Sequence, residues 1–397
     1  MINEKLTKHF STVKKSELFK EYYKSTNKIS ETIPLEKNEL REVLKKHFNL
    51  QSETKGIYLV RSGGSSTKPL IFPVDIEENL YQRKLLAIEL VKYGMFSSTT
   101  IAINLFSYKG MYRTAAIVDD ILEKCNATTI SLGASSSFEL AFNSAKQFKG
   151  NMLMGTPSKL TLFAKYIIDN NLKLVVKNVM YAGEFLIASQ VKLLKKAFNI
   201  QKIYSLYGSA ETGIWGWSTY SEKETSFDVL DDIIIEVVKK NENEDENENE
   251  DGAIVVTNLL RKRFPVFRYL MGDVGCLNYV NNKRVLTLKS RESKSFSVDA
   301  ESYFLDDFDW LYKIVDRFQI QLSLISPTET NISFLLIKEE QPINEENKIS
   351  IIIKNKLAQI FDVNPTNINL FTQFVEESDL YINSTTSKTP IIIDFRA

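Results

Sequence analysis

Short apolar segments alternate with amphipathic segments between residues 56 and 206, and this alternation constrains the fold of the chain most strongly. A short apolar run bounded by turn residues is typical of a buried strand, and apolar residues at three- and four-residue spacing indicate a helix. Strands that alternate with helices build layered α/β structures with buried sheet strands. The expected strands are 56–60, 99–105, 128–132, 151–154, 178–181 and 203–206, and the expected helices are 76–93, 112–125, 137–148, 158–170 and 188–198.

The regions on either side of this segment have a different texture. The N-terminal part is expected to be helical at 17–24 and 35–48. From residue 227 the pattern changes to strands, at 227–240, at 252–258 and onward to residue 288. The Asn/Glu-rich run 241–251 cannot bury apolar surface, so we expect a disordered hairpin loop there rather than a calcium site.

The length of the chain, 397 residues, is too great for one ordinary core. We expect a large N-terminal domain, residues 1–292, of layered α/β sheets with a β-rich subdomain, and a small C-terminal α+β domain, residues 293–397. The expected strands of the small domain are 319–325, 331–338 and 367–374, and its expected helix is 346–361.

Charge, cysteine and histidine content exclude several function classes. Lysine plus arginine and aspartate plus glutamate both number 50, so no net charge attracts nucleic acid or an anionic membrane. Cys125 and Cys276 are the only cysteines, which excludes a disulfide framework and a cysteine zinc site. His9 and His47, the only histidines, are predicted to be surface residues in a charged segment. No apolar stretch is long enough for a bilayer and the start has no apolar signal region, so we expect a cytoplasmic protein.

The stretch from Tyr204 to Gly213 combines an aromatic ring, small residues and one carboxylate in a tight loop after a strand. Glycines allow backbone N–H groups to approach phosphate oxygens, and a carboxylate can hold a divalent cation that bridges those oxygens. An aromatic-glycine turn is more often only a turn. This loop therefore indicates a nucleotide site only together with other features.

Three further segments have nucleotide-binding chemistry. Residues 62–69 follow a strand and concentrate hydroxyls and glycines before Lys68, which suits a polyphosphate, although the loop is not a Walker motif. Asp273, in a Gly-Asp turn, can accept hydrogen bonds from ribose hydroxyls. Lys388 lies in a small-residue loop near the C-terminus. Alone, the loop at 62–69 is about as likely to be a flexible turn, Gly-Asp is more often a hairpin turn, and an exposed lysine is usually just solvated.

In order and spacing, these four features resemble the motifs of the adenylate-forming superfamily of acyl-CoA synthetases, adenylation domains and luciferases, and most closely its phenylacetate-CoA ligase branch. The resemblance covers nearly the whole chain. Residues 62–69 resemble the S-S-G-T-T-G-K-P phosphate loop, 181–184 the G-E turn beside adenine, 207–211 the Y-G-x-[ST]-E motif, 268–273 the R-Y-x-x-G-D segment, 290–291 the G-R hinge and 387–396 the terminal G-K-x-x-x-x-x-D-x-R motif. Residues 106–111 and 156–158 also match an acyl-pocket segment and a T-P-S turn of the branch.

The resemblance implies a small domain on a hinge, ATP and Mg²⁺ as cofactors, and a reaction that gives an acyl adenylate and pyrophosphate before acyl transfer. It implies that Glu211 holds the metal, that Arg291 contacts ribose or phosphate near the hinge, and that Lys388 bridges carboxylate and phosphate oxygens. The implied nucleotide-binding residues are Ser62, Gly63, Gly64, Ser65, Ser66, Lys68, Gly183, Glu184, Tyr207, Gly208, Ser209, Thr212 and Asp273. The candidate pocket residues, whose bulk favours a small aromatic or acyl acid, are Phe106, Tyr108, Met111, Tyr181, Ala182 and Trp215.

Several positions depart from the family pattern. Ala210 stands where the family has a hydroxyl residue that contacts the α-phosphate, and Thr212 is a neighbour that can substitute. Residues 293–298 lack the glycine that keeps the pantetheine path open in CoA-using relatives, and Thr67 and Ser387 replace motif glycines. Two acceptors stay open, a thiol of CoA or of a carrier protein and an amine. The alternative from another class is a degenerate member that binds nucleotide or acyl ligand without turnover. The oligomeric state is not indicated.

Overall fold

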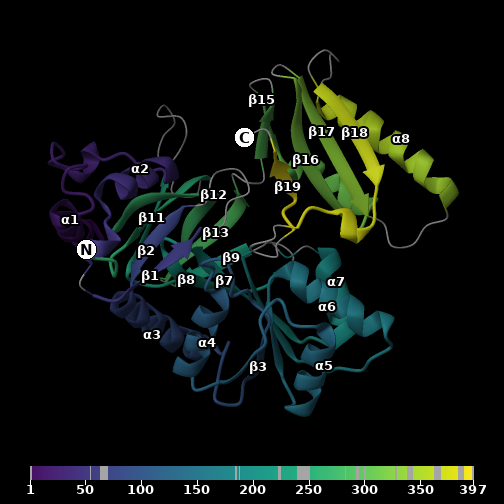
Figure 1. Cartoon of the computed structure of the whole chain (residues 1–397), viewed down its shortest axis with the longest axis horizontal. Helices are drawn as coiled ribbons and strands as arrows, with labels where there is room; N and C mark the ends of the chain where they lie inside the picture. Colours follow the sequence, from purple (N-terminus) through teal and green to yellow (C-terminus); the bar gives the residue numbers. More distant parts are fainter. Residues whose placement is uncertain are drawn as a thin grey trace. The chain divides into compact units, whose positions relative to one another are not determined.

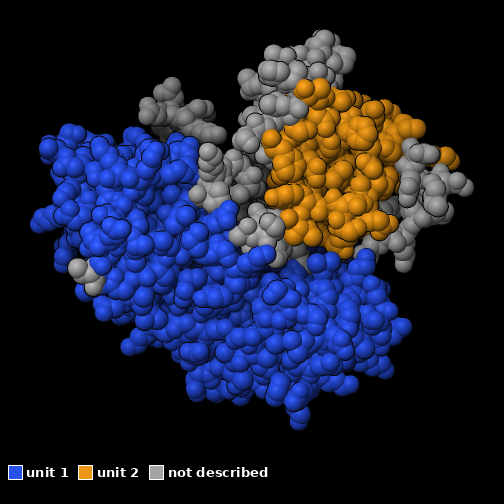
Figure 2. Space-filling model, viewed as in Figure 1, with its two compact units in different colours: residues 1–63, 69–289 blue, residues 64–68, 290–397 orange. Residues whose placement is uncertain are grey.

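A computed structural model describes most of the chain, namely residues 2–53, 55–62, 70–183, 186, 188–221, 225–238, 251–281, 283–291, 295–298, 301–326, 329–337, 343–361, 368–382 and 389–395. These residues form two compact units, one up to Lys289 and one from Ser290 onward (Figure 2). The predicted boundary after residue 292 falls within 292–294, outside the described residues, as do Lys388 and residues 241–250 of the loop predicted at 241–251.

The first unit is built on a mixed sheet in which eleven strands pair among the described residues, in the order β10-β11-β12-β13-β9-β8-β7-β6-β5-β3-β4 (Figure 1). Strands β3, β4, β5, β6 and β7 pair in parallel, and the pairs from β7 to β8 and β8 to β9 are antiparallel. The α/β layering expected from the sequence is confirmed. The strands are β3 (Ile101–Asn104), β4 (Thr128–Ser131), β5 (Met152–Gly155), β6 (Asn178–Ala182), β7 (Lys202–Ser209), β8 (Gly213–Thr219), β9 (Thr225–Val229), β10 (Ile233–Val238), β11 (Gly252–Asn258), β12 (Val266–Val280) and β13 (Lys283–Arg291).

Four described helices connect the parallel strands and α3 leads into the first of these strands, and together they cover both faces of that half of the sheet. They are α3 (Ile76–Tyr93), α4 (Thr114–Lys124), α5 (Phe138–Gln147), α6 (Pro157–Asp169) and α7 (Ala188–Phe198). Side chains alternate along a strand, so Ala102 of β3 joins the core under α3 and α4 while Ile103 joins the core under α5 to α7. Side-chain caps begin three of these helices, because Asp75, Ser137 and Thr156 each accept a hydrogen bond from the backbone of the first turn.

The N-terminal region packs on the antiparallel half of the sheet. It contains α1 (Ile2–Lys15), α2 (Lys37–His47), the short 3-10 helices η1 (Ile29–Glu31) and η2 (Leu50–Ser52), and an antiparallel pair of strands, β1 (Ile57–Arg61) and β2 (Ile71–Asp75). Their apolar faces share a core with Ile234 of β10 and with Phe267 and Tyr269 of β12. Leu35 forms a parallel bridge with Tyr269, which fixes the start of α2 beside β12.

Two predictions for the N-terminal region were wrong. Residues 17–24 form turns rather than a helix, because the Ser16 hydroxyl donates to Val13 O and accepts from Phe19 N, which ends α1. His9 is not a surface residue, since its face of α1 packs into the core and leaves the side chain 6% exposed. Burial lowers the pKa of His9 to about 4, and the positive charge of Lys262 adds to this effect.

The β-rich part also differs from expectation. The single strand predicted at 227–240 is interrupted after Val229 by a turn in which Ile233 N donates to Leu230 O at 3.1 Å, so that β9 and β10 are separate strands. Strands β2 and β8 were not predicted. Among the described helices, none has the combination of length and apolarity that crossing a membrane requires.

The second unit is a small α+β structure, as expected. A four-stranded sheet in the order β18-β17-β16-β19 packs against α8, and Phe334, Ile353 and Leu357 lie fully buried between them. A separate pair of strands, β14 and β15, begins the unit. The elements are β14 (Ser295–Val298), β15 (Glu301–Phe304), η4 (Leu305–Lys313), β16 (Arg317–Ser326), β17 (Glu329–Ile337), α8 (Ile343–Ile360), β18 (Ile368–Phe374), η5 (Glu377–Asp379) and β19 (Ile392–Asp394).

Candidate active site

The predicted nucleotide loop is the turn of the β7–β8 hairpin. Strand β7 pairs in parallel with β6 on one side and antiparallel with β8 on the other, so strand direction changes at this position. Ser209 pairs with Gly213 across the hairpin, and Ala210, Glu211 and Thr212 form the turn between them. The turn therefore lies at the carboxyl end of a parallel strand, which is where open α/β sheets bind ligands.

Glu211 is buried in this turn, with 2% of its surface exposed. Its carboxylate forms a hydrogen bond with the Tyr269 hydroxyl of β12. Its Oε1 atom has no hydrogen-bond partner among the described residues. Burial raises the pKa of Tyr269 well above its ordinary value, and the Glu211 carboxylate adds to the rise because a phenolate beside it would be repelled. A buried carboxylate oxygen without a donor is costly unless a cation or a donor binds it.

Hydroxyl groups hold the turn from inside. The Thr212 hydroxyl, fully buried, accepts from Trp215 Nε1 at 2.9 Å and from Ser209 N at 3.2 Å, and it also lies 3.0 Å from Ser209 Oγ. Thr212 N in turn donates to Ser209 Oγ. In this geometry the Thr212 hydroxyl is committed to the loop, and its substitution for the hydroxyl that Ala210 lacks stays a prediction.

The hairpin is tight enough to require glycine at Gly208. A Cβ atom added there would lie 2.0 Å from Gly213 O, which no packing adjustment of side chains can relieve. Gly213 has a φ of +73°, a left-handed conformation that glycine adopts without strain. Both glycines therefore set the path of the backbone on either side of Glu211.

Polar side chains from α3 and β11 support the turn from beneath. The carbonyl oxygen of Thr212 accepts from Gln82 Nε2 at 3.0 Å and from Asn258 Nδ2 at 2.8 Å. Asn258 also donates to Gln82 Oε1, so the two amides are joined. Arg261, which is 1% exposed, donates through Nη2 to Asn79 Oδ1, while its Nε and Nη1 have no partner in the described part of the chain.

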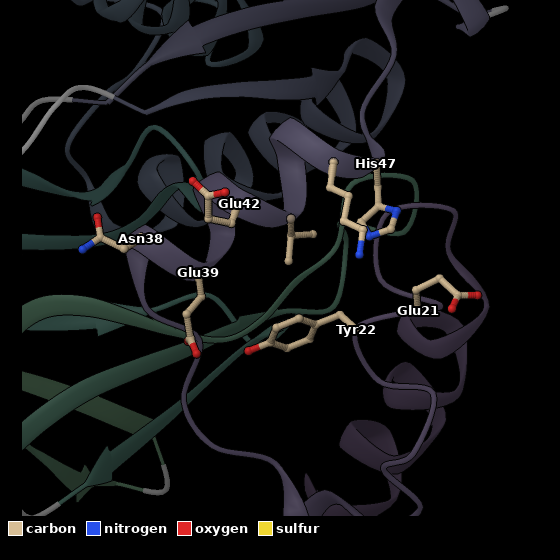
Figure 3. A pocket seen from close by; sticks show the side chains of 8 residues that line it. Glu21, Tyr22, Asn38, Glu39, Glu42 and His47 are labelled. Carbon is tan, nitrogen blue, oxygen red and sulfur yellow. The ribbon is translucent and has the colours of Figure 1, made fainter.

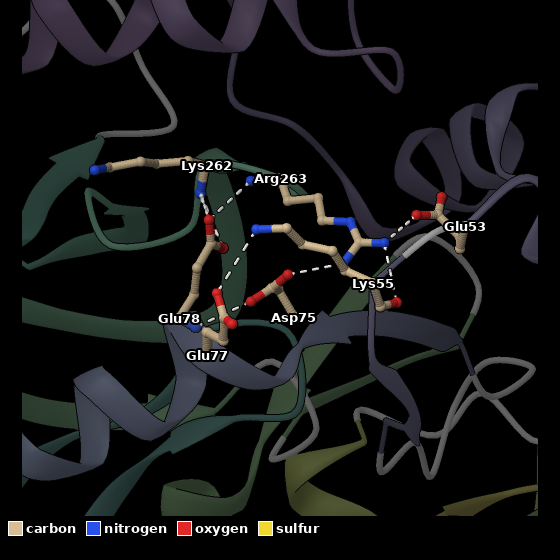
Figure 4. Close-up of polar contacts among 7 residues, drawn as sticks. All are labelled: Glu53, Lys55, Asp75, Glu77, Glu78, Lys262 and Arg263. Atoms are coloured by element: carbon tan, nitrogen blue, oxygen red, sulfur yellow. Dashed lines mark hydrogen bonds and ion pairs between the residues drawn. The ribbon is translucent and has the colours of Figure 1, made fainter.

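Ion pairs tie the segment after β11 to the start of α3 (Figure 4). Glu78 accepts from the backbone N–H groups of Lys262 and Arg263 at 3.1 Å. The Arg263 guanidinium binds Asp75 at 2.8 Å and also binds Glu53. These contacts hold the segment next to Arg261 in place. They therefore help to position the polar side chains that support the hairpin turn.

Tyr207 and Asp273, both predicted to contact the nucleotide, are brought together. The Tyr207 hydroxyl donates to Asp273 Oδ2, although β7 and β12 are far apart in sequence. The Tyr207 ring packs edge-on against Trp215 with centroids 4.9 Å apart and tilted against Phe227 at 5.1 Å. Neighbouring side chains therefore hold both residues in fixed orientations.

Ser62 and Gly183 are the other described members of the predicted nucleotide set. The hydroxyl oxygen of Ser62 accepts from Leu70 N, and Ser62 N donates to Leu70 O, so Ser62 fixes the start of the predicted phosphate loop. Gly183, which follows β6, has a φ of +83°. Gly63, Gly64, Ser65, Ser66, Lys68 and Glu184 lie outside the described residues.

The predicted acid-pocket residues lie in different surroundings. Phe106 and Trp215 belong to the core under α3 and α4, and Tyr181 belongs to the core under α5 to α7. Tyr108 and Met111 are exposed. Ala182 is partly buried against the first of these cores. The role of these six side chains as an acid pocket stays a prediction.

A pocket of about 440 Å³ lies in the N-terminal region (Figure 3). Helix α2 lines one side of it, and residues that precede η1 line the other. It contains none of the predicted site residues. Its lining consists of Glu21, Tyr22, Asn38, Glu39, Glu42, Val43, Lys46 and His47.

The predicted catalytic residues beyond the first unit are only partly described. Arg291 is the last residue of β13, and its side chain lies outside the described part, as does Lys388. Their roles stay predictions.

The described residues contain no group of three or more His, Cys, Asp or Glu that could hold a metal ion. Mg²⁺ needs no such group, because in nucleotide sites it keeps several waters and binds one or two carboxylates together with substrate phosphates. Glu211, with one unpartnered buried oxygen, fits such a site.

Four supporting residues were missed by the sequence reading: Gln82, Asn258, Arg261 and Tyr269. The first three have no motif, and their role depends on contacts between segments far apart in sequence. Tyr269 lies inside the R-Y-x-x-G-D segment, so its position was available as a signal but its bond to Glu211 was not.

Comparisons with known proteins agree with this fold. No protein-family model matches the chain. A solved 2-hydroxyisobutyryl-CoA ligase in the postadenylation state, with 2-HIB-AMP, superposes with a TM-score of 0.77 at 14% identity over 100% of this chain and 89% of that chain. A solved acyl acid amido synthetase in complex with 2,4-DB superposes with a TM-score of 0.72 at 14% identity over 98% of this chain and 90% of that chain.

A curated relative is indoleacetate–lysine synthetase of Pseudomonas savastanoi, 28% identical over 248 residues. The match spans 60% of this chain and 58% of the relative, less than two thirds of that protein. The chain thus has the fold of the adenylate-forming ligases, and the resemblance predicted from its motifs is confirmed. The matched proteins are, by their names, a CoA ligase, an amido synthetase and an indoleacetate–lysine synthetase. That this chain belongs to the phenylacetate-CoA ligase branch stays a prediction.

Proposed function

We propose that the chain is an ATP- and Mg²⁺-dependent ligase that activates a small carboxylic acid as its acyl adenylate and transfers the acyl group to an amine. The Glu211 carboxylate carries this proposal, because it is buried at the β7–β8 turn and one of its oxygens has no partner among the described residues. A bound Mg²⁺ ion, which prefers oxygen ligands, would satisfy that atom.

The proposed chemistry has two steps. A carboxylate oxygen of the acid attacks the α-phosphorus of ATP, and the bond to the bridging oxygen of pyrophosphate breaks. The amine nitrogen then attacks the acyl carbon, the bond to AMP breaks, and the amine loses a proton to solvent. Mg²⁺, when bound, neutralises phosphate oxygens and so lowers the repulsion between the two anions.

The residues of the chain position the reactants in this scheme. Glu211 would hold the metal, and Tyr207 and Asp273, already bonded to each other, would hold the nucleoside. Arg291 and Lys388 would contact phosphate and carboxylate oxygens, which the family resemblance implies. Since adenylation involves no protein nucleophile, we expect its rate to depend on this positioning.

An exchange assay tests the first step. The enzyme is expected to exchange labelled pyrophosphate into ATP only when a suitable carboxylic acid is present. Glu211→Gln should raise the Mg²⁺ concentration for half-maximal exchange by about tenfold or more, because it removes the charge that binds the metal. An unchanged Mg²⁺ requirement in E211Q, or full exchange in Lys388→Ala, would contradict these assignments.

A second assay identifies the acceptor. Two observations favour an amine, namely the missing glycine at 293–298 and the curated relative, whose name joins indoleacetate and lysine. Planar aromatic acids are therefore tried first, with lysine, hydroxylamine and CoA as separate acceptors. Amide formation that is unaffected by CoA is the expected result. A thioester formed faster than any amide would assign the thiol instead.

Ala210 favours a second candidate, a member that binds nucleotide without turnover. Ala210 packs against the core of the N-terminal region, and the neighbouring Thr212 hydroxyl is committed to the loop. ATP binding without exchange for any acid in a broad panel would support this candidate.

A further inference from the structure

The buried face of helix α3 changes from polar to apolar along its length. The first half of the helix buries Asn79, Gln82 and Arg83, and the second half buries Leu86, Ala87 and Leu90. These positions recur at three- and four-residue spacing, so they share one side of the helix. A buried polar side chain costs free energy unless hydrogen bonds satisfy it, and an apolar side chain of similar size often packs at lower cost. The polar half of this face therefore has a reason other than packing.

The amide of Gln82 bonds to the backbone on both sides of Gly213. The residue is 1% exposed, and its Nε2 atom donates to Thr212 O at 3.0 Å and to Ile214 O at 3.1 Å. Its Oε1 atom accepts from Asn258 Nδ2 at 3.0 Å. Asn258 Nδ2 also donates to Thr212 O, at 2.8 Å. Two joined amides, one from α3 and one from β11, thus hold one carbonyl group of the hairpin turn.

Gly213 allows α3 to approach the turn directly. A Cβ atom at this position would lie 2.8 Å from Gln82 Nε2 and 3.0 Å from Arg261 Nη2, so no side chain separates the helix from the backbone. Glycine has more conformational freedom than any other residue. Hydrogen bonds to the carbonyl oxygens of Thr212 and Ile214, on either side of this glycine, therefore select one conformation of the turn.

The same contacts set the position of Glu211, which directly precedes Thr212. The N–H and hydroxyl groups of Thr212 bond inside the hairpin, to Ser209 and Trp215. The two amides connect the turn to α3 and β11, which are separate elements of the first unit. The backbone that carries the Glu211 carboxylate is therefore held from outside the hairpin as well as from inside it.

We propose that Gln82, together with Asn258, is a positioning residue for the metal, because it holds the β7–β8 turn in the conformation in which Glu211 binds Mg²⁺. This inference rests on the proposed function, and it gives a role to a part of α3 outside the segments that resemble family motifs. Gln82 acts through the backbone of the turn and does not touch the nucleotide. A change at Gln82 should therefore alter the part of nucleotide binding that depends on Mg²⁺ and leave the rest unchanged.

Calorimetry on the full chain tests the proposal, with ATP affinity measured in Mg²⁺ and in EDTA. The ratio of the two affinities is the gain that the metal gives. Gln82→Met keeps the length of the side chain and removes the amide. It is expected to lower the gain by about threefold to tenfold, less than Glu211→Gln does, and to leave the affinity in EDTA unchanged. The Mg²⁺ concentration for half-maximal pyrophosphate exchange should rise by a similar factor.

Leu86→Ala is the matched control for stability, because Leu86 lies one turn further along the same face of α3 and is fully buried. It should lower the melting temperature at least as much as Q82M does and keep the wild-type gain from Mg²⁺, measured where each variant is folded. Asn258→Ala should lower the gain as Q82M does. The double variant should lose less than the sum of the two single losses, because both amides bind one oxygen.

Equal losses of the gain in Q82M and L86A would mean that Gln82 acts through stability alone and would overturn the inference, as would a wild-type gain in Q82M. If Q82M does not fold, Gln82→Asn replaces it, since this change shortens the side chain by one methylene group.

The exchange assay separates failure of this inference from failure of the proposed function. A protein that shows no carboxylate-dependent exchange, yet loses the Mg²⁺ gain in Q82M and not in L86A, would contradict the ligase and support the positioning role. A wild type whose ATP affinity does not depend on Mg²⁺ would overturn the positioning role.

Discussion

At the scale of single residues, the Thr212 hydroxyl has the most partners in the turn that holds Glu211. Replacing Thr212 by valine keeps the shape of the side chain but leaves Trp215 Nε1 and Ser209 N without their buried acceptor. Unsatisfied buried donors cost about 1–3 kcal/mol each in mutational series, so T212V should lower the free energy of unfolding by at least that amount.

Urea unfolding followed by tryptophan fluorescence measures this change. Thr212→Ser is the matched control, since it retains the hydroxyl and should lose less stability than T212V. Equal stability in T212V and wild type would show that the hydroxyl has no structural role.

The sequence predicted single residues where a motif named them and missed them where only long-range contacts did. Tyr207 and Asp273 were assigned to one site by resemblance, and they are bonded directly. Gln82 and Asn258 are separated by 176 positions, and both bind the carbonyl of Thr212. No local pattern contains that relation, because it arises only when α3 packs beneath the β7–β8 hairpin.

At the scale of elements, the β7–β8 hairpin depends on glycine for a steric reason. Gly208→Ala would bring Cβ to 2.0 Å from Gly213 O, and backbone must move to relieve the clash. A Cβ on Gly216, in the same hairpin, meets its nearest atom at 3.3 Å. We expect G208A to lower the free energy of unfolding by about 3 kcal/mol or more and G216A by much less.

Nucleotide affinity should follow the same order, because only G208A displaces the turn that holds Glu211. Calorimetric binding of ATP to both variants, at temperatures where each is folded, measures this. Similar losses in the two variants would mean that general stability, and not the path of the hairpin, controls binding.

Elements were predicted well where periodicity was clear and poorly where glycine or polar residues interrupted it. Helix α3 was predicted over its full range, residues 76–93. Strand β8 was missed because glycine, here Gly213 and Gly216, is uncommon in strands, whereas pairing with β7 and β9 on both sides makes the segment a strand. The strand predicted at 227–240 passed over the turn after Val229, where Asp231 and Asp232 interrupt the apolar residues.

At the scale of the whole molecule, the sequence indicated layered α/β structure but not the strand order. The order β4-β3-β5-β6-β7 and the change to antiparallel pairing at β8 result from packing between distant segments. That change of direction places the turn with Glu211 at the carboxyl end of β7. The fold class was thus predictable from local periodicity, while the position of the site within the sheet came from motif resemblance alone.

Acid stability of the first unit should depend on His9, the buried histidine of α1. Its pKa in the folded protein is about 4, below the ordinary value of 6.5, because burial disfavours the charged ring and Lys262 repels it. The unfolded chain therefore binds a proton more readily than the folded chain does. The contribution of His9 to stability is present above pH 6.5 and is lost as the pH falls toward 4, by about 3 kcal/mol in total.

His9→Leu removes this titration and fits an apolar site in the N-terminal core. The free energy of unfolding is measured in urea at pH 7 and pH 4.5 for the wild type and H9L, with His47→Gln as the control for loss of the other histidine. The wild type should lose roughly 2–3 kcal/mol more than H9L between the two pH values, and H47Q should behave as the wild type does. Carboxylates that titrate in this range affect all three proteins alike, so the difference reports His9 alone. Parallel losses in wild type and H9L would mean that α1 opens to solvent before the ring is protonated.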